Sequence, residues 1–317
     1  MGAPLECADP PACDAEPPPA PPVVAWNDTI GSTVTVAMGP ARHRGRDLFY
    51  REGEAMFAIA KFAYGPLDDD LQGEDVSVFL LRDCAGAWEP LGTVRTTQDD
   101  EMPTIEGVAD TGGRVYVPLP ALGPGRHRVH FVVQGDGSRA DAYLQVLRDG
   151  ERIVVSDVDG TLTESETAEF LTLLAGPSPA DNPDAAAVMW ALARRGYHLF
   201  YLTARPEWLE PRTHQWLDEE RGFPPGIVHT TLDGIGAIGG AAATFKTDEL
   251  AAITARLGYP PDFAFGNTDT DGQAYAAAGV DASRRYAYRF DDPSGATRID
   301  DYGSLLASIG ALPPVCR

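Results

Sequence analysis

Residues 153–163 (IVVSDVDGTLT) place the strongest constraint on how this chain can fold. The β-branched apolar run at residues 153–155 predicts a buried strand of a parallel sheet. The run ends in two carboxylates, Asp157 and Asp159, and Gly160 then permits a tight turn that most residues would strain. Open α/β sheets bind ligands at the carboxyl edge of their strands, so both acids are expected in a ligand site.

The spacing of these two acids indicates a particular chemistry. Carboxylates so close together repel each other unless a cation lies between them or one of them holds a proton. That arrangement favours metal-assisted phosphoryl transfer through an aspartyl-phosphate. A simple helix cap is the alternative role for Asp157.

Length and charge limit the classes of protein that fit. The 317 residues are enough for two domains, and 44% of them are hydrophobic, which can fill two cores. Asp and Glu outnumber Lys and Arg by 47 to 25, so the formal net charge is −22. That charge argues against a nucleic acid as partner and against membrane attachment through a polybasic patch. Solubility alone explains it. The sequence shows no apolar stretch of transmembrane length, and it leaves the oligomeric state open.

The four cysteines are Cys7, Cys13, Cys84 and Cys316. They form no Cys-x-x-Cys pair and no histidine cluster accompanies them, so zinc is not expected. Their even number suggests disulfides, and Cys7–Cys13 with Cys84–Cys316 is one of three possible pairings. We therefore expect an extracytoplasmic protein (periplasmic, secreted or a lipoprotein) whose signal peptide has been removed. The alternative is a cytoplasmic protein with four unpaired thiols.

The first half of the sequence predicts a leader and a β domain. Residues 1–25 are rich in Pro, Ala and Asp, which predicts a stiff, extended leader. Residues 26–148 predict an all-β, immunoglobulin-like antiparallel sandwich, because short apolar runs alternate with Gly, Pro and Asp. Residues 135–137 (GDG) predict its last hairpin turn, and the acidic run 68–70 is expected to be a solvated loop rather than a calcium site. The expected strands are 34–36, 56–64, 76–81, 91–94, 115–117, 129–133 and 142–147.

Residues 149–317 change character, because strand and helix patterns now alternate. This βαβ succession predicts an α/β domain with a Rossmann-like parallel sheet covered by helices. Trp190, Trp208 and Trp216 fall on helical patterns and are expected in the core or at its rim, with lipid contact as the alternative for Trp208. The expected strands are the one before Asp157 and those at 198–203, 227–230, 263–266 and 285–288. The expected helices are 166–174, 184–195, 209–221, 246–257 and 273–278.

Polar residues at three further element ends are expected to converge on the edge where Asp157 lies. Thr203 ends a strand and begins the segment Thr-Ala-Arg-Pro, Lys246 is expected at the start of a helix, and residues 266–271 (GNTDTD) follow the last strong apolar strand. Each has an ordinary alternative: a cap for Thr203, a surface position for Lys246 and a turn for the acidic cluster. Their joint order along the chain is what favours a site.

The order of these segments resembles the four motifs of the haloacid-dehalogenase (HAD) phosphatase superfamily. Within it, the sequence is most like the catalytic domain of lipins, the magnesium-dependent phosphatidate phosphatases. The likeness covers residues 150–290 and departs at Thr268, where lipins have Arg. The β domain instead resembles the bacterial and fungal actin-patch family of phosphatidate phosphatases, whose motif has Asp-Asp-Thr where Gly160-Thr161 stands here. The lipin-like segments are Ser156–Thr163, Gly196-Tyr197, Tyr201–Arg205, Phe245-Lys246, and Phe265-Gly266-Asn267 with Asp271 and Tyr275.

The resemblance implies a role for each motif residue. Asp157 would attack phosphorus, and Asp159 would protonate the leaving oxygen and later deprotonate water. Thr203 would bond a phosphoryl oxygen, and Lys246 would offset the charge of the phosphoaspartate. Mg²⁺ would be held by Asp157, by the backbone carbonyl of Asp159 and by Asp271. The substrate-binding positions would be Gly160, Thr161, Ala204, Arg205 (on substrate phosphate or on a neighbouring carboxylate) and Asn267, with Asn267 or Asp269 also supporting the metal ligands.

The short spacings between Thr161, Thr203 and Lys246 leave no room for a large cap domain. We therefore expect an open site that suits a bulky substrate, such as a phosphorylated lipid at a membrane surface. The first hypothesis is a Mg²⁺-dependent phosphatidate phosphatase that releases diacylglycerol and phosphate. Lipin-like domains also occur in phosphatidylinositol-transfer proteins, where they sense phosphatidate without turning it over, and this is the second hypothesis. A phosphatase of a soluble phosphomonoester is the third.

Overall fold

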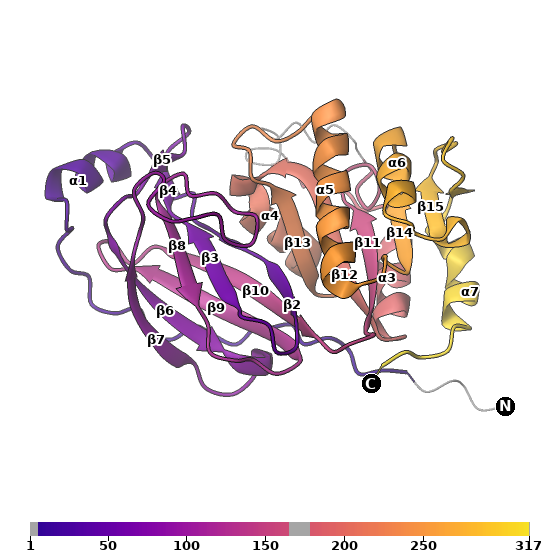
Figure 1. Cartoon of the computed structure of the whole chain (residues 1–317), viewed down its shortest axis with the longest axis horizontal. Coiled ribbons are helices and arrows are strands. Elements are labelled where there is room, and N and C mark those ends of the chain that lie inside the picture. The colour runs from indigo at the N-terminus through magenta and orange to yellow at the C-terminus, as the bar shows by residue number, and fades with distance from the viewer. Residues whose placement is uncertain (1–5, 165–177, 317) are drawn as a thin grey trace. The chain divides into compact units, whose positions relative to one another are not determined.

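The computed structural model describes residues 6–164 and 178–316 of the chain, which form two compact units (Figure 1). One unit is Pro11–Leu147. The other begins at Arg148 and also includes residues 6–10. The helix expected at 166–174 lies outside the described residues.

The first unit is a β-sandwich, and its inner side chains, such as Val78, Phe131 and Leu144, are buried. Most neighbouring strands are antiparallel, as expected. The smaller sheet has the order β1 (Arg44–Arg46), β3 (Phe57–Lys61), β8 (Arg114–Pro118). The larger has the order β2 (Leu48–Arg51), β10 (Arg139–Leu147), β9 (Gly125–Val133), β6 (Asp75–Leu81), β7 (Glu89–Arg95), and β4 (Ala63–Tyr64) pairs with β5 (Asp69–Asp70).

The last two strands of the sandwich confirm one expectation and depart from another. Gly137 lies in the turn between β9 and β10 with φ of 75°, and its N–H donates to the carbonyl of Val133 at 2.9 Å. Glycine adopts this left-handed conformation without steric cost, so the expected hairpin is confirmed. On its other side, however, β10 pairs with β2 in parallel, with Leu144 opposite Leu48. The sandwich is therefore not purely antiparallel.

Residues 34–36 lie in a helix, so the strand expected there is wrong. Helix α1 spans Thr29–Ala37, and the carboxylate of Asp28 accepts hydrogen bonds from the backbone amides of Ile30 and Gly31. Such a cap satisfies amide groups that the first helical turn leaves without partners. The β preference of two valines depends on packing against a sheet, which this exposed segment lacks.

The acidic run at 68–70 is ion-paired, so the expectation of a solvated loop is wrong. Asp68 accepts from the guanidinium of Arg44 at 2.6 Å, and Asp70 pairs with the ammonium of Lys61 at 2.9 Å. Both cations are buried. A buried cation requires a charged partner, and the acidic run provides one for each.

Residues 13–16 of the Pro-rich leader are bonded to the sandwich. The indole N–H of Trp88 donates to the carbonyl of Glu16 at 2.9 Å, and Arg128 Nη1 donates to the carbonyl of Cys13 at 2.9 Å. A segment rich in proline has few amide donors of its own, so side chains of the sandwich bond its carbonyl groups instead.

The cysteines pair as Cys7–Cys316 and Cys13–Cys84. The pairing Cys7–Cys13 with Cys84–Cys316 is therefore wrong, although the expectation of two disulfides is confirmed. Each bond closes within one unit. Cys7–Cys316 joins residues 309 positions apart, a proximity that spacing in the sequence could not reveal.

The second unit contains a six-stranded sheet whose neighbouring strands are all parallel, as expected for a Rossmann-like domain. The strand before Asp157 is central and lies between two neighbours, which explains its unbroken apolar run. The sheet order is β13 (Gly226–Thr231), β12 (Tyr197–Pro206), β11 (Arg152–Asp157), β14 (Phe263–Gly266), β15 (Arg285–Tyr288), β16 (Thr297–Ile299).

The helices of this unit differ from expectation mainly at their ends. Lys246 lies inside α5 rather than at its start, and the segment 209–221 is split into a 3₁₀ turn, α4 and a π-helical turn (Gln215–Glu220). Helices α5 and α6 pack side by side (Figure 1). The helices are α3 (Ala185–Ala193), α4 (Glu210–His214), α5 (Gly240–Leu257), α6 (Asp269–Ala277) and α7 (Leu306–Gly310).

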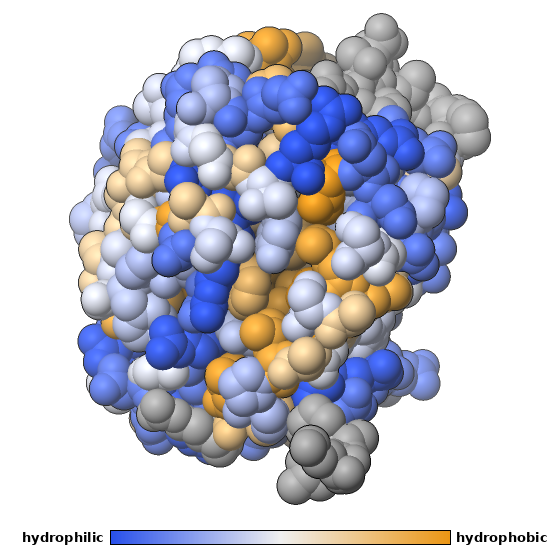
Figure 2. Space-filling model, turned by 90° about the vertical axis from the view of Figure 1, so that its right-hand side faces the viewer, coloured by the Kyte–Doolittle hydropathy of each residue, from blue (hydrophilic) through white to orange (hydrophobic). Residues whose placement is uncertain are grey.

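The core of the second unit lies on the face of the sheet that α3 and α7 cover. Trp216 is fully buried in it, whereas Trp190 packs against it while partly exposed, so both lie in the core or at its rim as expected. Figure 2 looks at the side of the unit that carries α7 and β15. This face is largely hydrophilic, with apolar side chains gathered in a strip at its centre.

A buried histidine makes the sandwich sensitive to pH. His43 Nδ1 accepts the amide of Ala63 at 3.3 Å, and its Nε2 lies 2.7 Å from Ser138 Oγ. Burial lowers the pKa of His43 to about 4, against the opposing charge of Asp136. The neutral imidazole is therefore the form that the folded sandwich contains.

The pKa of His43 is about 4 in the folded protein and 6.5 in the unfolded chain. Between these two pH values, the imidazole therefore binds a proton in the unfolded chain but not in the folded protein. The stabilisation is complete above about pH 6.5 and is lost as the pH falls toward 4. We expect His43 to reduce the unfolding free energy by about 2 kcal/mol between pH 7 and pH 5. The unfolding free energy can be measured at both pH values by urea denaturation, with hydrogen exchange of β9 and β10 as the signal. It should fall between pH 7 and pH 5 in the wild type but not in His43→Gln. Equal pH slopes for the two proteins would contradict the prediction.

Candidate active site

The central strand ends in the proposed nucleophile. Asp157 is the last residue of β11 and is almost completely buried, although its carboxylate would be charged in water. Gly160 follows with φ of 73°, and its amide donates to Thr163 Oγ1 at 2.9 Å. The turn expected after Asp-x-Asp is thus formed, and it brings Thr161 Oγ1 to 3.1 Å from Asp157 Oδ2.

Two residues that sequence analysis missed hold this turn in place. Asn182 Nδ2 donates to the carbonyls of Thr161 and Thr163 at 2.7 and 2.9 Å, and the hydroxyl of Tyr302 donates to the carbonyl of Thr161 at 3.1 Å. All four residues are buried. Asn182 precedes a proline in a polar stretch, and Tyr302 lies beyond the resembling region, so neither gave a signal in the sequence.

Lys246 joins two acids from different elements of the fold. Its Nζ donates to Asp157 Oδ1 at 2.7 Å and to Asp271 Oδ1 at 2.5 Å. All three side chains are nearly inaccessible to solvent. Lys246 comes from α5, Asp157 from β11 and Asp271 from α6, so the expected convergence of three distant motifs occurs.

Burial and charge act in opposite directions on this triad. Burial raises the pKa of Asp157 to about 7, while the ammonium of Lys246 opposes that rise and the charges of Asp271 and Asp159 add to it. Burial would lower the pKa of Lys246, but the two acids raise it above its ordinary value. The lysine is therefore charged at neutral pH, and Asp157 depends on it to remain a carboxylate.

Asp159 forms a second cluster with Thr203 and Arg205. Thr203 Oγ1 donates to Asp159 Oδ2 at 2.9 Å, and Arg205 donates to both carboxylate oxygens from Nε and to Oδ1 from Nη2 at 2.8 Å. Arg205 is fully buried and also donates to Thr213 Oγ1 at 3.0 Å. Of the two roles open to Arg205, the structure shows the contact with a neighbouring carboxylate.

Asp271 caps a helix as well as pairing with Lys246. Its Oδ2 accepts from the amides of Asn267 and Thr268, both at 3.1 Å, and from Thr268 Oγ1 at 2.7 Å. Thr268 and Asp271 form a capping box at the start of α6. A Cβ atom at Gly266 would collide with the side chain of Asp271, so only glycine allows this close approach. Both oxygens of Asp271 are therefore already bonded within the protein.

Asn267, which was expected to bind substrate or to support the metal ligands, is linked to Asp157 through the hydroxyl of Thr161. Its Oδ1 is 2.9 Å from Thr161 Oγ1, and that hydroxyl is 3.1 Å from Asp157 Oδ2. Asp269, the other residue with that expected role, is exposed and accepts from Gln273 Nε2 at 2.6 Å. Asn267 thus joins the site, and Asp269 lies outside it.

The charges and donor atoms of the site fit Mg²⁺. Three carboxylates face two buried cations, Lys246 and Arg205, which leaves one uncompensated negative charge. The available oxygens belong to carboxylate, amide and main-chain groups, the ligands that this hard cation prefers. Asp157 Oδ2 and Asn267 Oδ1 lie 3.1 and 2.9 Å from the neutral hydroxyl of Thr161, whereas Asp157 Oδ1 and Asp271 Oδ1 accept from the ammonium of Lys246.

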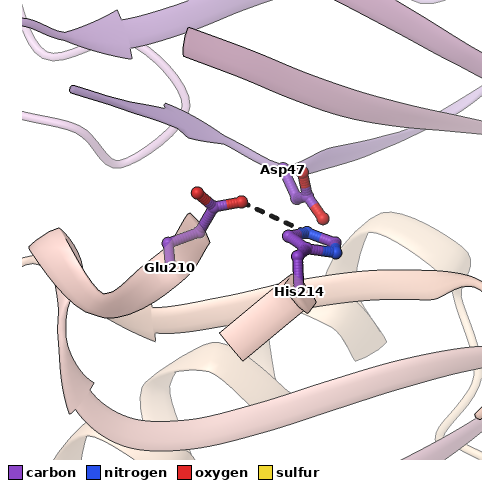
Figure 3. A group of neighbouring side chains, drawn as sticks. All are labelled: Asp47, Glu210 and His214. Carbon is purple, nitrogen blue, oxygen red and sulfur yellow. Dashed lines mark ion pairs between the residues drawn. The ribbon is translucent and has the colours of Figure 1, made fainter. Parts of the chain in front are cut away.

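A separate acid–histidine pair lies on α4 (Figure 3). Glu210 and His214, one turn apart, are joined at 3.1 Å, and His214 Nδ1 is 3.3 Å from Asp218. Such pairs along one helix face stabilise the helix. Asp47, also labelled in Figure 3, belongs to the sandwich, where it accepts the amide of Tyr143 at 2.8 Å.

Removal of the buried ammonium should destabilise this unit. Lys246→Met keeps an unbranched side chain as far as Cε but leaves two buried acids facing each other, so we expect a loss of about 3–5 kcal/mol in unfolding free energy. Asp157→Asn in the same chain should restore part of it. The loss should shrink as the pH falls, since protonation of Asp157 removes the repulsion. Urea denaturation of the single and double variants at pH 8 and pH 5 measures these changes in unfolding free energy. A Lys246→Met protein as stable as the wild type at pH 8 would contradict them.

Two family models match the chain, one in each unit. Residues 41–146 match the beta-sandwich domain of PITM 1-3, and residues 154–288 match the LNS2 domain of PITM 1-3. The second range contains every candidate site residue that the sequence predicted, whereas Tyr302 lies beyond it.

Curated relatives match across both units. The protein retinal degeneration B of Drosophila melanogaster is 33% identical over 222 residues, which are 68% of this chain and 15% of that protein. Human membrane-associated phosphatidylinositol transfer protein 1 is 29% identical over 255 residues, 78% of this chain and 18% of that protein. The chain thus spans less than a fifth of the length of these relatives.

The expectation of an extracytoplasmic protein is wrong. It rested on the cysteines alone, whereas the homologues are named membrane-associated phosphatidylinositol transfer proteins rather than secreted proteins. Close pairs of cysteines report which residues meet in the fold, and they do not establish the compartment. Among the residues that the structure describes, no helix has the length and apolarity needed to span a membrane.

The matches agree with the structure on both parts of the chain. The segments that resemble lipins lie within residues 154–288, the range that matches the LNS2 domain. The chain therefore carries a β-sandwich domain followed by an LNS2 domain, and it is homologous to the membrane-associated phosphatidylinositol transfer proteins.

Proposed function

We propose that the LNS2 domain of this chain is a Mg²⁺-dependent phosphatidate phosphatase that releases diacylglycerol and phosphate. The observation that carries the proposal is the contact of Lys246 with Asp157 and Asp271 at 2.7 and 2.5 Å. The ammonium of Lys246 favours the charged form of the buried Asp157 carboxylate, whose second oxygen can attack phosphorus. The chain has aspartate at both acidic positions of the Asp-x-Asp motif, Asp157 and Asp159.

Each residue has a defined task in this proposal. Asp157 forms the aspartyl-phosphate, and Lys246 balances the charge that remains on that group. Asp159, which Thr203 and Arg205 orient, transfers the proton to the leaving oxygen and takes one from the attacking water. Both transfers require Arg205 to loosen its bidentate hold, and a phosphate group entering beside it offers the guanidinium an alternative partner.

Mg²⁺ would supply charge compensation at the phosphoryl oxygens. The residues to hold it are Asp157, the backbone carbonyl of Asp159 and a group from the loop 266–271. We propose Asn267 Oδ1 for the last position in preference to Asp271, because Asp271 accepts hydrogen bonds on both oxygens.

The lipid substrate is supported by the family of the domain and by its short insertions. The homologues are named for the transfer of a phosphorylated lipid, phosphatidylinositol. Phosphatidate shares the glycerophosphate part of that lipid but ends in a phosphomonoester, which an aspartate nucleophile can attack.

Replacement of the nucleophile should abolish phosphate release. Asp157→Asn keeps the size of the side chain, and we expect a loss of roughly a thousandfold or more in turnover of dispersed phosphatidate with Mg²⁺. Asp269→Asn is the matched control, because Asp269 is an exposed acid at the start of α6, outside the cluster. It should retain wild-type turnover. Wild-type activity in Asp157→Asn, with contaminating phosphatases excluded, would refute the proposal.

A second candidate function is phosphatidate binding without turnover. The specific observation is the state of Asp159, whose carboxylate is taken up by Arg205 and Thr203 through four contacts. A general acid must be free to reach the leaving oxygen, whereas both oxygens of the Asp159 carboxylate are bonded by Arg205. If Arg205 keeps this partner when lipid binds, the domain recognises the phosphate but does not cleave it.

One set of samples separates the two functions. Wild-type protein is mixed with phosphatidylcholine vesicles that contain phosphatidate, with Mg²⁺ or with EDTA, and both sedimentation and free phosphate are measured. Phosphate release that EDTA abolishes supports the enzyme. Sedimentation that depends on phosphatidate, without release, supports the second candidate. Release from sugar or nucleotide phosphates at a higher rate than from phosphatidate would reject both.

A further inference from the structure

The loop between β13 and α5 exposes two isoleucines. Ile235 and Ile238 are 80% and 82% exposed, in a segment, residues 232–239, with the sequence LDGIGAIG. Within residues 148–164 and 178–316, these are the large apolar side chains that the structure leaves exposed. Their concentration in one loop requires an explanation, because exposed apolar residues are usually scattered singly.

Hydrogen bonds define the shape of this loop. The amide of Ile235 donates to Asp233 Oδ1 at 3.0 Å, and Gly236 adopts φ of 77°, which folds the chain between the two isoleucines. The amide of Ala237 donates to the carbonyl of Ala204 at 2.9 Å. The loop is therefore fastened to the Thr-Ala-Arg segment, whose Thr203 and Arg205 hold Asp159.

A tryptophan lies beside the loop. Trp208 is half-buried, and its indole N–H donates to the carbonyl of Gly234 at 2.7 Å. Its polar atom is thereby satisfied while part of the ring remains accessible. Tryptophan in this condition is favoured at the boundary between water and lipid.

We propose that residues 232–239, with Trp208, insert into the surface of a lipid bilayer and set the depth at which the candidate active site meets phosphate headgroups. This inference deepens the proposed function and rests on it for the identity of the ligand. A lipid phosphate at Asp157 has its acyl chains pointing away from the carboxyl edge of the sheet. The loop follows β13 at that same edge, so its isoleucines and the acyl chains can enter one apolar layer.

The charge of the chain indicates that a bilayer would be bound through apolar insertion rather than through electrostatic attraction. With a net charge of −22, the protein is repelled by anionic membranes. The loop contains one ionisable residue, Asp233, and its carboxylate is turned back onto the amide of Ile235. Binding must then come from apolar burial, which salt does not screen.

The test compares two double variants on vesicles of phosphatidylcholine with a tenth part of phosphatidate. Ile235→Asn/Ile238→Asn removes the apolar side chains without adding charge. Ile30→Asn/Leu67→Asn is the matched control, since these side chains of the sandwich are 80% and 77% exposed. We expect roughly tenfold weaker vesicle binding for the loop variant, unchanged binding for the control, and wild-type binding that persists from 0.1 to 0.5 M NaCl.

A soluble substrate separates this inference from the proposed function. With dibutanoyl phosphatidate below its micelle concentration, the loop variant should keep wild-type turnover, because neither isoleucine touches the catalytic cluster. No turnover of any phosphatidate by the wild type would reject the enzyme, while vesicle sedimentation would still decide the role of the loop. Equal vesicle binding by wild type and loop variant, equal losses in loop and control variants, or release of the wild type by salt would each overturn the inference.

Discussion

The buried ammonium of Lys246 is the interaction on which the candidate site depends. Its Nζ donates to both Asp157 on β11 and Asp271 on α6, and without it two buried carboxylates would face each other. Repulsion between such groups is relieved by protonation, and a protonated Asp157 is no nucleophile. The same contact therefore joins α5 to α6 at the sheet edge and, in the proposed phosphatase, favours the charged form of Asp157 that acts as the nucleophile. Structure and chemistry cannot be separated at this position.

The parts of the site that sequence could predict are those fixed by backbone topology. The carboxyl ends of parallel strands meet at one edge, so Asp157, Thr203 and the loop 266–271 had to lie together once the βαβ order was recognised. Positions within that edge depend on side-chain contacts instead. Arg205 faces Asp159 because Thr213 holds its other nitrogen, and Asp271 turns to Lys246 because Thr268 occupies its second oxygen. No spacing in the chain records these choices.

The errors in the sandwich have a common physical cause. Valines 34 and 36 predicted a strand, yet the local cap at Asp28 determines a helix. The acids at 68–70 predicted a solvated loop, yet Arg44 and Lys61 are buried and need them as partners. In both places a specific hydrogen bond or ion pair overrides a residue preference that is worth only a fraction of a kcal/mol. Disulfide pairing failed for a related reason, since it depends on distances that only the folded chain defines.

The two clusters of the site differ in how firmly they hold their acids, and this difference bears on function. Asp157 shares its lysine with Asp271, so in the proposed function a phosphate would meet an acid whose charge is only partly compensated. Asp159 has a guanidinium to itself and is the acid with the greater exposure. Phosphate that approaches the edge can compete for Arg205 without disturbing the buried triad. Recognition would then precede chemistry, because the proton-transferring acid is freed only when a phosphate has taken its partner. A domain built in this way can evolve between sensing a lipid phosphate and cleaving it through the strength of one ion pair, with every other residue of the site unchanged.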